Sequence, residues 1–229
     1  MAYELGGLPL NRVANFAPHR GLRRGFIACA ALTLLATSLP PATAGASKLS
    51  DDTIAAVVGP GGHVYASVPS PLFKYPNIVA GIAQVQTYVV THPNVTVTFA
   101  SALDAAKYPE KLDAFWISQN HHDLHDGFMG PVDMAAFNRA VYDALKRGGI
   151  YIVLDHVAAK GSPADVTDTL HRIEPSTVRR EVEAAGFKYE GESNILANPA
   201  DPHTAGVFDS SIQGRTDQFI LKFRRPRSS

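Results

Sequence analysis

The chain has almost no cysteine: Cys29 is the single cysteine among 229 residues. One thiol cannot form an internal disulfide, and Cys29 lies in a segment that we predict below to be removed, so thiol chemistry is excluded for the rest of the chain. The sequence also has no excess of charge, because 21 basic residues balance 21 acidic ones. Since no Lys/Arg run is present either, we expect no nucleic-acid partner.

No apolar run is long enough to cross a bilayer as a helix. The longest, Phe26 to Leu39, follows three arginines, ends at Pro40-Pro41 and is succeeded by the small residues Ala42-Thr43-Ala44. This order is typical of a secretory signal peptide. We therefore predict that residues 1–46 are a signal peptide and that residues 47–229 form one domain, periplasmic or secreted, with no membrane contact after cleavage.

The arginines bear on the route of export. Arg23-Arg24 resembles the twin-arginine signature, which accompanies folding before export. The alternative interpretation of this region is a core helix at the N-terminus, although such a helix has no need of the arginines or of the proline exit.

Strand-like and helix-like patterns alternate along the remaining chain. The strand patterns cover 63–68, 95–100, 112–118, 150–157, 187–193 and 218–223, and the helix patterns cover 78–90, 134–147 and 175–185. This alternation predicts βαβ units and a mostly parallel sheet. Gly148-Gly149 is predicted to end the second helix. The long irregular segment 194–216 is predicted to be either functional or mobile.

Two strand patterns end in polar groups. The pattern at 112–118 runs into Gln119 to Asp126, which is rich in amide, imidazole and carboxylate groups, and the pattern at 150–157 carries Asp155 and His156 near its end. In open parallel sheets ligands bind at the carboxyl ends of strands, where loops and helix N-termini converge. We therefore predict a site at this edge of the sheet.

Several motifs resemble known families. Three of them, in order, resemble class I S-adenosylmethionine (SAM)-dependent methyltransferases: Leu145-Lys146-Arg147-Gly148-Gly149-Ile150, Val182-Glu183-Ala184-Ala185-Gly186-Phe187 and Asp217-Gln218-Phe219-Ile220-Leu221-Lys222-Phe223. Four others resemble a family of exported, predicted bacterial methyltransferases: 118–125, Asp155-His156, 168–173 and 214–217. The resemblance covers residues 54–226. It implies a Rossmann-like α/β fold with an antiparallel C-terminal strand, SAM as cofactor and a small-molecule methyl acceptor.

The N-terminal part departs from these families, which begin with a strand and a glycine-rich loop whose backbone approaches the cofactor. Too few residues separate the predicted cleavage site from Thr53 to build them. We therefore predict an incomplete fold in which 112–118 either pairs directly with 63–68 or leaves backbone groups unpaired, which is costly when they are buried. Gly59-Pro60-Gly61-Gly62 is interpreted as a plain turn, because it precedes a strand. Val68-Pro69-Ser70 lacks the acidic residue that many relatives direct at the ribose.

The resemblance assigns roles to the polar residues. Asn120 falls beside the transferred methyl group, where its amide would hold the acceptor, and the alternative is a turn cap. His122 or His125 is a candidate general base. Asp155 and His156 form either an orienting carboxylate–imidazole pair or a strand-end hydrogen bond.

Four residues after the strand at 95–100 correspond to the adenine-binding positions of the relatives. They are Ser101, Ala102, Leu103 and Asp104, and together with Asn120 they are the predicted cofactor-binding residues. The alternative is a helix cap by Asp104. The His/Asp cluster at 121–126 also offers metal donors, but its spacing matches no established zinc pattern, so no metal ligand is predicted.

Two functions remain open at this point. One is transfer of a methyl group from SAM to a small acceptor. The other is a non-catalytic periplasmic binding protein, or a truncated remnant that has lost SAM binding.

Overall fold

The computed structural model describes the backbone of residues 26–31 and, with side chains, residues 58–59, 61–74, 89–101, 104, 107–130 and 132–228. The strands are β1 (Phe26–Ala31), β2 (His63–Pro69), β3 (Val95–Ala100), β4 (Leu112–Ser118), β5 (Leu145–His156), β6 (Lys188–Ser193) and β7 (Gln218–Arg224). The α-helices are α4 (Met134–Ala144), α5 (Val166–Leu170) and α6 (Pro175–Ala184), and the 3-10 helices are η2 (Ser70–Lys74), η4 (His122–His125) and η5 (Gly127–Met129).

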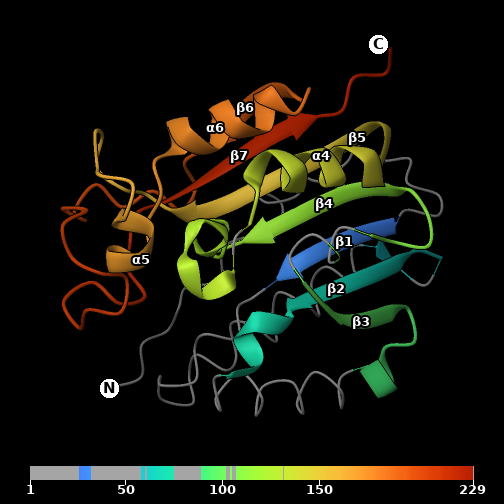
Figure 1. Ribbon diagram of the computed structural model, residues 1–229, viewed down its shortest axis with the longest axis horizontal. Helices are drawn as coiled ribbons and strands as arrows, with labels where there is room; N and C mark the ends of the chain where they lie inside the picture. The colour runs from blue at the N-terminus through green and yellow to red at the C-terminus, as the bar shows by residue number, and fades with distance from the viewer. Residues whose placement is uncertain are drawn as a thin grey trace.

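The strands form one sheet in the order β3-β2-β1-β4-β5-β7-β6 (Figure 1). From β3 to β5 all neighbours are parallel, whereas β7 runs antiparallel to both β5 and β6. The predicted α/β class, with a mostly parallel sheet and an antiparallel C-terminal strand, is confirmed.

The centre of the sheet differs from the expectation. β1 lies between β2 and β4 and pairs in parallel with both, with Ala28 opposite Tyr65 on one side and Phe115 on the other. The prediction that the first strand is missing, and that β4 pairs directly with β2, is therefore wrong. β1 comes from the segment interpreted as the apolar core of a signal peptide. Cleavage after Ala44 would remove β1 from the sheet. If the segment is a signal peptide, the mature protein lacks its central strand, and if the segment is not cleaved, the sheet keeps it.

β5 begins earlier than its apolar pattern indicates. α4 ends at Ala144, and β5 starts at Leu145, so Gly148 and Gly149 lie inside a strand and do not cap the helix. The pairing of β4 with β5 shifts register between Leu112 and Ala114, where two steps along β4 face five along β5, so these glycines belong to a bulge in β5. Gly148 has a φ of 81°, a conformation that glycine adopts without steric cost. The prediction that Gly148-Gly149 ends the helix is therefore wrong, because the helix ends four residues earlier, at Ala144.

α4 and α6 cover one face of the sheet. Asp133 caps α4 by accepting hydrogen bonds from the backbone N–H groups of Ala135 and Ala136, at 2.9 and 3.1 Å. Phe137 and Val141, one helical turn apart, are buried against the sheet. Pro175 occupies the first turn of α6, where its missing N–H is not needed.

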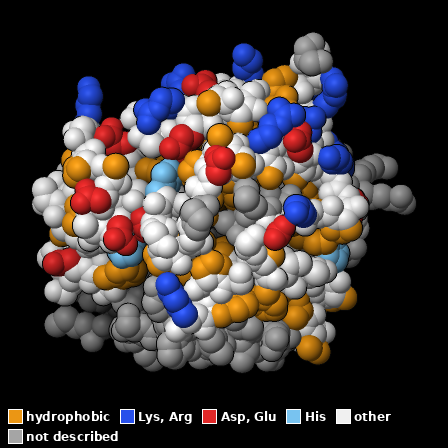
Figure 2. Space-filling view, viewed as in Figure 1, with side chains coloured by type: hydrophobic (Ala, Val, Ile, Leu, Met, Phe, Trp, Pro, Cys, Tyr) orange, Lys and Arg blue, Asp and Glu red, His pale blue; other side chains and the backbone are white. Residues whose placement is uncertain are grey.

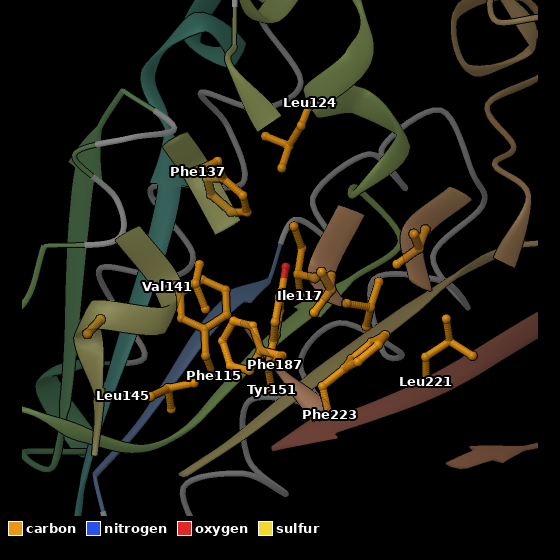
Figure 3. Packing of buried hydrophobic residues seen from close by; sticks show 14 of the residues in the cluster. Phe115, Ile117, Leu124, Phe137, Val141, Leu145, Tyr151, Phe187, Leu221 and Phe223 are labelled. Carbon is orange, nitrogen blue, oxygen red and sulfur yellow. The ribbon is translucent and has the colours of Figure 1, made fainter. Parts of the chain in front are cut away.

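Aromatic side chains dominate this layer of the core (Figure 3). Phe115 of β4 meets Tyr151 of β5 edge-on with ring centroids 5.4 Å apart, and Tyr151 meets Phe187 at the same distance. Such ring pairs contribute about 0.5–1.5 kcal/mol each beyond the burial of their area. They hold β4, β5 and the segment after α6 in one register, which fixes the strand ends that carry the site.

The remaining predicted elements agree in part with the structure. The bounds of β3 and β4 match the predicted strands, and β2, β6 and β7 each differ from theirs by one residue. The predicted helix at 78–90 lies almost wholly outside the described residues. Within the described ranges, no helix combines the length and apolarity needed to cross a membrane.

The stability of shortened chains tests whether the protein needs β1 at the centre of its sheet. A chain of residues 45–229 lacks β1 and leaves the facing backbone groups of β2 and β4 unpaired. We expect its thermal midpoint, followed by circular dichroism, to fall by on the order of 10 °C or its transition to lose cooperativity, because several ladder hydrogen bonds are lost. Residues 20–229, which keep β1, are the control. Equal midpoints for both chains would show that β1 is dispensable and would favour cleavage.

Candidate functional site

The carboxyl ends of the parallel strands meet at one edge of the sheet, which lies on the left in Figure 1 next to η4 and α5. β1 has β2 on one side and β4 on the other, so the strand order reverses here. In open α/β sheets this reversal opens a crevice beyond the strand ends, and ligands bind there. The polar run after β4 lies at this edge.

The turn after β4 has an uncommon backbone conformation. Gln119 has a φ of 57°, in the left-handed region that non-glycine residues seldom adopt. Its N–H donates to the carbonyl of Leu154 in β5 at 2.8 Å, which ties the turn to the neighbouring strand. Asn120 follows, 1% exposed, and its Oδ1 has no hydrogen-bond partner among the described residues. A buried amide oxygen without a partner at a strand end is a candidate ligand contact.

His122 and Asp155 form the central contact of the site. Nδ1 of His122 donates to Oδ1 of Asp155 at 2.7 Å, and the backbone N–H of His122 donates to Oδ2 at 2.9 Å. The other ring nitrogen, Nε2, lies 3.2 Å from Oδ1 of Asp123. All three side chains are buried. The imidazole therefore stands between two carboxylates.

These contacts control the charge of His122. Burial lowers the pKa of His122, but the carboxylates of Asp155 and Asp123 outweigh burial and raise it well above its ordinary value. Burial likewise raises the pKa of Asp155, and the imidazolium outweighs it and lowers that pKa. His122 is thus protonated at neutral pH, and this geometry does not favour it as a general base in the ligand-free chain.

His125, the other base candidate, is also occupied. Its Nδ1 donates to the carbonyl of His121 at 3.2 Å, and its Nε2 contacts the carboxylate of Glu181 in α6 at 3.0 Å. Burial lowers the pKa of His125, and Glu181 outweighs burial and raises it. His125 therefore serves to fasten η4 to α6.

Two imidazoles stay neutral. Burial, together with the neighbouring histidines, lowers the pKa of His121 to about 4, and neither ring nitrogen of His121 has a hydrogen-bond partner among the described residues. Burial also lowers the pKa of His156 to about 4. Nδ1 of His156 bonds to Oγ1 of Thr216 at 2.8 Å.

The predicted pairing of Asp155 with His156 takes a different form. The carboxylate of Asp155 bonds to the ring of His122, and from His156 it accepts only the backbone N–H, at 2.8 Å. Asp155 and His156 are neighbours in β5, and successive side chains in a strand point to opposite faces of the sheet. The ring of His156 therefore does not meet the carboxylate of Asp155 as the ring of His122 does. The strand-end hydrogen bond, which was the alternative, is the one present.

The predicted adenine-binding residues are described in part. Ser101 and Asp104 are exposed, and Ala102 and Leu103 lie outside the described residues. Oγ of Ser101 accepts from the N–H of Asp104 and donates to its carboxylate, and Lys107 bonds to the same carboxylate. These contacts are the cap-like alternative, with Ser101 rather than Asp104 accepting the backbone N–H.

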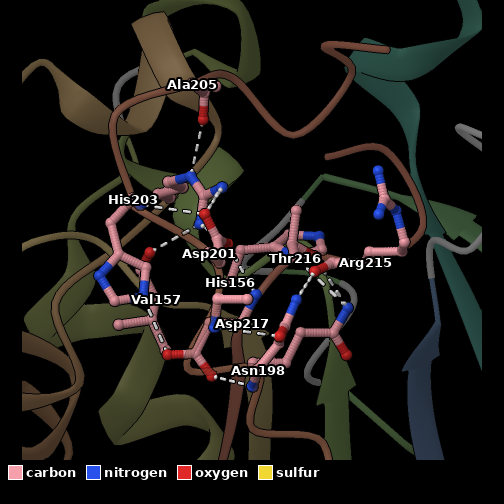
Figure 4. A network of polar contacts seen from close by, with 12 residues as sticks. His156, Val157, Asn198, Asp201, His203, Ala205, Arg215, Thr216 and Asp217 are labelled. Carbon is pink, nitrogen blue, oxygen red and sulfur yellow. Dashed lines mark hydrogen bonds and ion pairs between the residues drawn. The ribbon is translucent and has the colours of Figure 1, made fainter. Parts of the chain in front are cut away.

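The long segment 194–216 is anchored by a buried ion pair (Figure 4). Nη1 of Arg172 lies 2.9 Å from Oδ2 of Asp201, and both side chains are fully buried. Arg172 also donates to the carbonyls of Val157 and Ala205, and Asp201 accepts the backbone N–H groups of His203 and Asp217. The pair thus binds the segment to the end of β5, beside the site.

Sequence reasoning placed His121 and Asp123 in the polar cluster without giving either a role, and it did not connect His171 with the site. The ring of His171 meets that of His122 edge-on, with centroids 5.6 Å apart, and its Nδ1 lies 3.8 Å from Oδ1 of Asp123. The side chain of His171 is 28% exposed, and Figure 2 shows histidine surface among acidic side chains on the side of the molecule that carries α5. A His-Arg pair in a loop, such as His171-Arg172, is more often a surface or capping pair, and nothing in the local sequence places His171 beside η4.

Comparison with known proteins identifies the fold. No family model matches the sequence, and no curated protein matches it. Among solved structures, a SAM-dependent methyltransferase from Aquifex aeolicus has a TM-score of 0.54 at 14% identity over 94% of this chain and 88% of that one. The fold is methyltransferase-like.

Two further structures share this methyltransferase-like fold. The N-methyltransferase NodS from Bradyrhizobium japonicum WM9 has a TM-score of 0.52 at 13% identity, over 89% of this chain and 85% of that chain. The [4+2]-cyclase SpnF has a TM-score of 0.56 at 16% identity, over 94% of this chain and 80% of that chain. At such identities the similarity establishes the fold, and the chemistry has to be argued from the site.

The Arg172–Asp201 pair gives a stability prediction. Asp201→Asn leaves a buried guanidinium without its counter-charge, which costs about 3–5 kcal/mol. Burial raises the pKa of Asp201, while its hydrogen bonds and Arg172 outweigh burial and lower it. The contribution is therefore full at neutral pH and is lost as the pH falls below about 4. Urea unfolding at pH 7 and at lower pH measures both effects.

Asp209 provides the matched control in the same segment. It is exposed and bonds to Ser211 alone among the contacts of its carboxylate. Asp209→Asn should leave the urea midpoint at pH 7 nearly unchanged. If Asp201→Asn shifts the midpoint as little, the pair does not anchor the segment.

Proposed function

We propose that this chain is a SAM-dependent methyltransferase that acts on a small-molecule acceptor at the carboxyl edge of β1, β4 and β5. The observation that carries the proposal is the reversal of strand order at β1, with the buried polar cluster of η4 placed beside it. The solved structures of the same fold that are described as methyltransferases support it.

The residues of this edge fit SAM in part. The buried, unpartnered Oδ1 of Asn120 is an acceptor for a polar group of a ligand at the end of β4. At the end of β2, Val68-Pro69-Ser70 offers no carboxylate for ribose hydroxyl groups. The position of Ser101 and Asp104 after β3 is suited to the adenine side of a nucleoside. Asn120 would therefore hold the methyl-bearing end, and the hydroxyl groups of the ribose would meet other donors.

When bound, SAM supplies a methyl group on a positively charged sulfonium sulfur. Transfer would join the methyl carbon to a lone pair on an acceptor oxygen or nitrogen, and the electron pair of the former carbon–sulfur bond would remain on sulfur. The proton of the acceptor would pass to water or to a neutral imidazole of the site, His121 or His156. The contribution of the protein is to hold acceptor and methyl carbon in line, which Asn120 would do through its side-chain amide.

Thermal unfolding of the full chain with SAM, with S-adenosylhomocysteine and with adenosine alone tests the proposal. A ligand that binds only the native state raises the midpoint, and at a hundredfold excess over the dissociation constant the rise corresponds to about 2.7 kcal/mol, or about 5–10 °C for a domain of this size. We expect this shift with SAM and S-adenosylhomocysteine.

Asn120→Ala separates this site from binding elsewhere. The variant should reduce the SAM-dependent shift by half or more, while Ser70→Ala, an exposed change after β2, should leave it unchanged. A cooperative transition that no SAM concentration moves would refute the proposal and favour a non-catalytic binding protein.

A further inference from the structure

Three potential metal-binding side chains converge beside the proposed methyl-transfer site. His122 and Asp123 belong to η4, and His171 follows α5. One ligand atom from each residue lies within 4.8 Å of the other two, and no other group of three or more His, Cys, Asp or Glu residues in the described ranges does so. We propose that His122, Asp123 and His171 bind one divalent transition-metal cation of the zinc type.

The distances between the donor atoms suit such an ion. Nε2 of His122 lies 3.2 Å from Oδ1 of Asp123, and Nδ1 of His171 lies 3.8 Å from the same oxygen. Two ligands of a tetrahedral zinc ion with bonds of about 2.0–2.1 Å stand about 3.3 Å apart. The first pair already has this separation. Nδ1 of His171, which is partly exposed, would have to move about 0.5 Å closer to Asp123 and up to about 1.5 Å closer to Nε2 of His122 to reach it.

Asp155 orients His122 for this role. It accepts the proton of Nδ1 at 2.7 Å and receives the backbone N–H of the same residue, so the tautomer and the plane of the ring are both fixed. The remaining nitrogen, Nε2, lies 3.2 Å from Oδ1 of Asp123. Metal-binding histidines almost always donate their second ring N–H to a carboxylate or carbonyl in this way. Asp155 is thus a positioning residue for the ion.

Asp123 is the second, independent indication. Its side chain is fully buried, yet neither carboxylate oxygen makes a hydrogen bond with the described residues, because the contact with Nε2 of His122 has the distance but not the angle of one. A buried carboxylate normally has several donors around it. Asp126, which follows η4 and is also buried, likewise has two carboxylate oxygens without a hydrogen-bond partner among the described residues. A divalent cation would give the buried carboxylate of Asp123 both a contact for its oxygens and a compensating positive charge.

The ligand set indicates the class of the ion. Two imidazoles and a carboxylate suit zinc, iron(II), cobalt(II) or manganese(II), whereas magnesium and calcium prefer oxygen ligands alone. Three protein ligands leave at least one coordination position for water or a substrate oxygen. A role of the ion as a Lewis acid that activates an acceptor hydroxyl rests on the proposed methyl transfer. Binding of the ion does not depend on that proposal.

Metal binding is tested on the full chain without SAM. The protein is stripped with a chelator, loaded with Zn²⁺, dialysed and analysed by mass spectrometry of the metal, and its dissociation constant is measured against a competing chelator. The same chain is titrated with Co²⁺, whose visible absorption reports coordination by imidazole and carboxylate. We expect one Zn²⁺ per chain and a Co²⁺ spectrum that Zn²⁺ abolishes and Mg²⁺ leaves unchanged.

His171→Asn is the decisive variant. His171 has a φ of 53°, and Asn is among the residues that best tolerate this left-handed conformation, so the change removes the imidazole with little strain. We expect the dissociation constant for Zn²⁺ to rise at least about tenfold in His171→Asn and in Asp123→Asn. Asp155→Asn should weaken binding by about 10–100-fold and alter the Co²⁺ spectrum without abolishing it.

His63→Gln is the control, because His63 lies at the amino end of β2, at the opposite edge of the sheet. It should bind Zn²⁺ as the unmodified chain does. A wild-type chain that retains no Zn²⁺, or His171→Asn with unchanged affinity, overturns the proposal. Since SAM is absent, a chain that binds Zn²⁺ but not SAM refutes the proposed function alone, and the reverse result refutes the metal site alone.

Discussion

The carboxylate of Asp155 at the end of β5 is the constraint on which the site depends. A fully buried carboxylate is tolerated only where donors surround it, and here they are the ring and backbone N–H of His122 and the backbone N–H of His156. To bring His122 over the end of β5, the chain turns sharply at Gln119 in a left-handed conformation. His121, Asp123 and His125 then take their places because they share one short helical turn with His122.

The strands that sequence reasoning located well are those with two clear ends. β3 is a run of β-branched residues bounded by Asn94 and Ser101, and β4 is an apolar run that stops at polar residues, so composition alone delimits them. β1 could not be recognised in this way, because a short apolar run after arginines has the same composition whether it is a signal-peptide core or a buried strand. Only the unpaired edges of β2 and β4, which are tertiary features, distinguish the two.

The sequence predicted where the site lies, at the carboxyl ends of β4 and β5, but not which side chains contact one another there. That polar groups after β4 and β5 lie together follows from the parallel sheet. Which carboxylate meets which imidazole does not, because it depends on the alternation of side chains along β5 and on the path of the turn after β4. His171 is remote in sequence from η4 but meets His122 in space, and the buried Arg172–Asp201 pair and the backbone bonds of Ile173 to the end of β5 hold the chain beside it.

The fold leaves the chemistry open, since a [4+2]-cyclase shares it with methyltransferases. The two functions proposed for this edge depend on different atoms: cofactor binding on the amide of Asn120, and cation binding on Nε2 of His122. That nitrogen holds either a proton or a metal ion, because both would use the same lone pair facing Asp123. An ion that displaces this proton would replace a buried imidazolium with a charge able to contact substrate. The cluster would then change from a structural contact into a reactive one without any movement of the sheet.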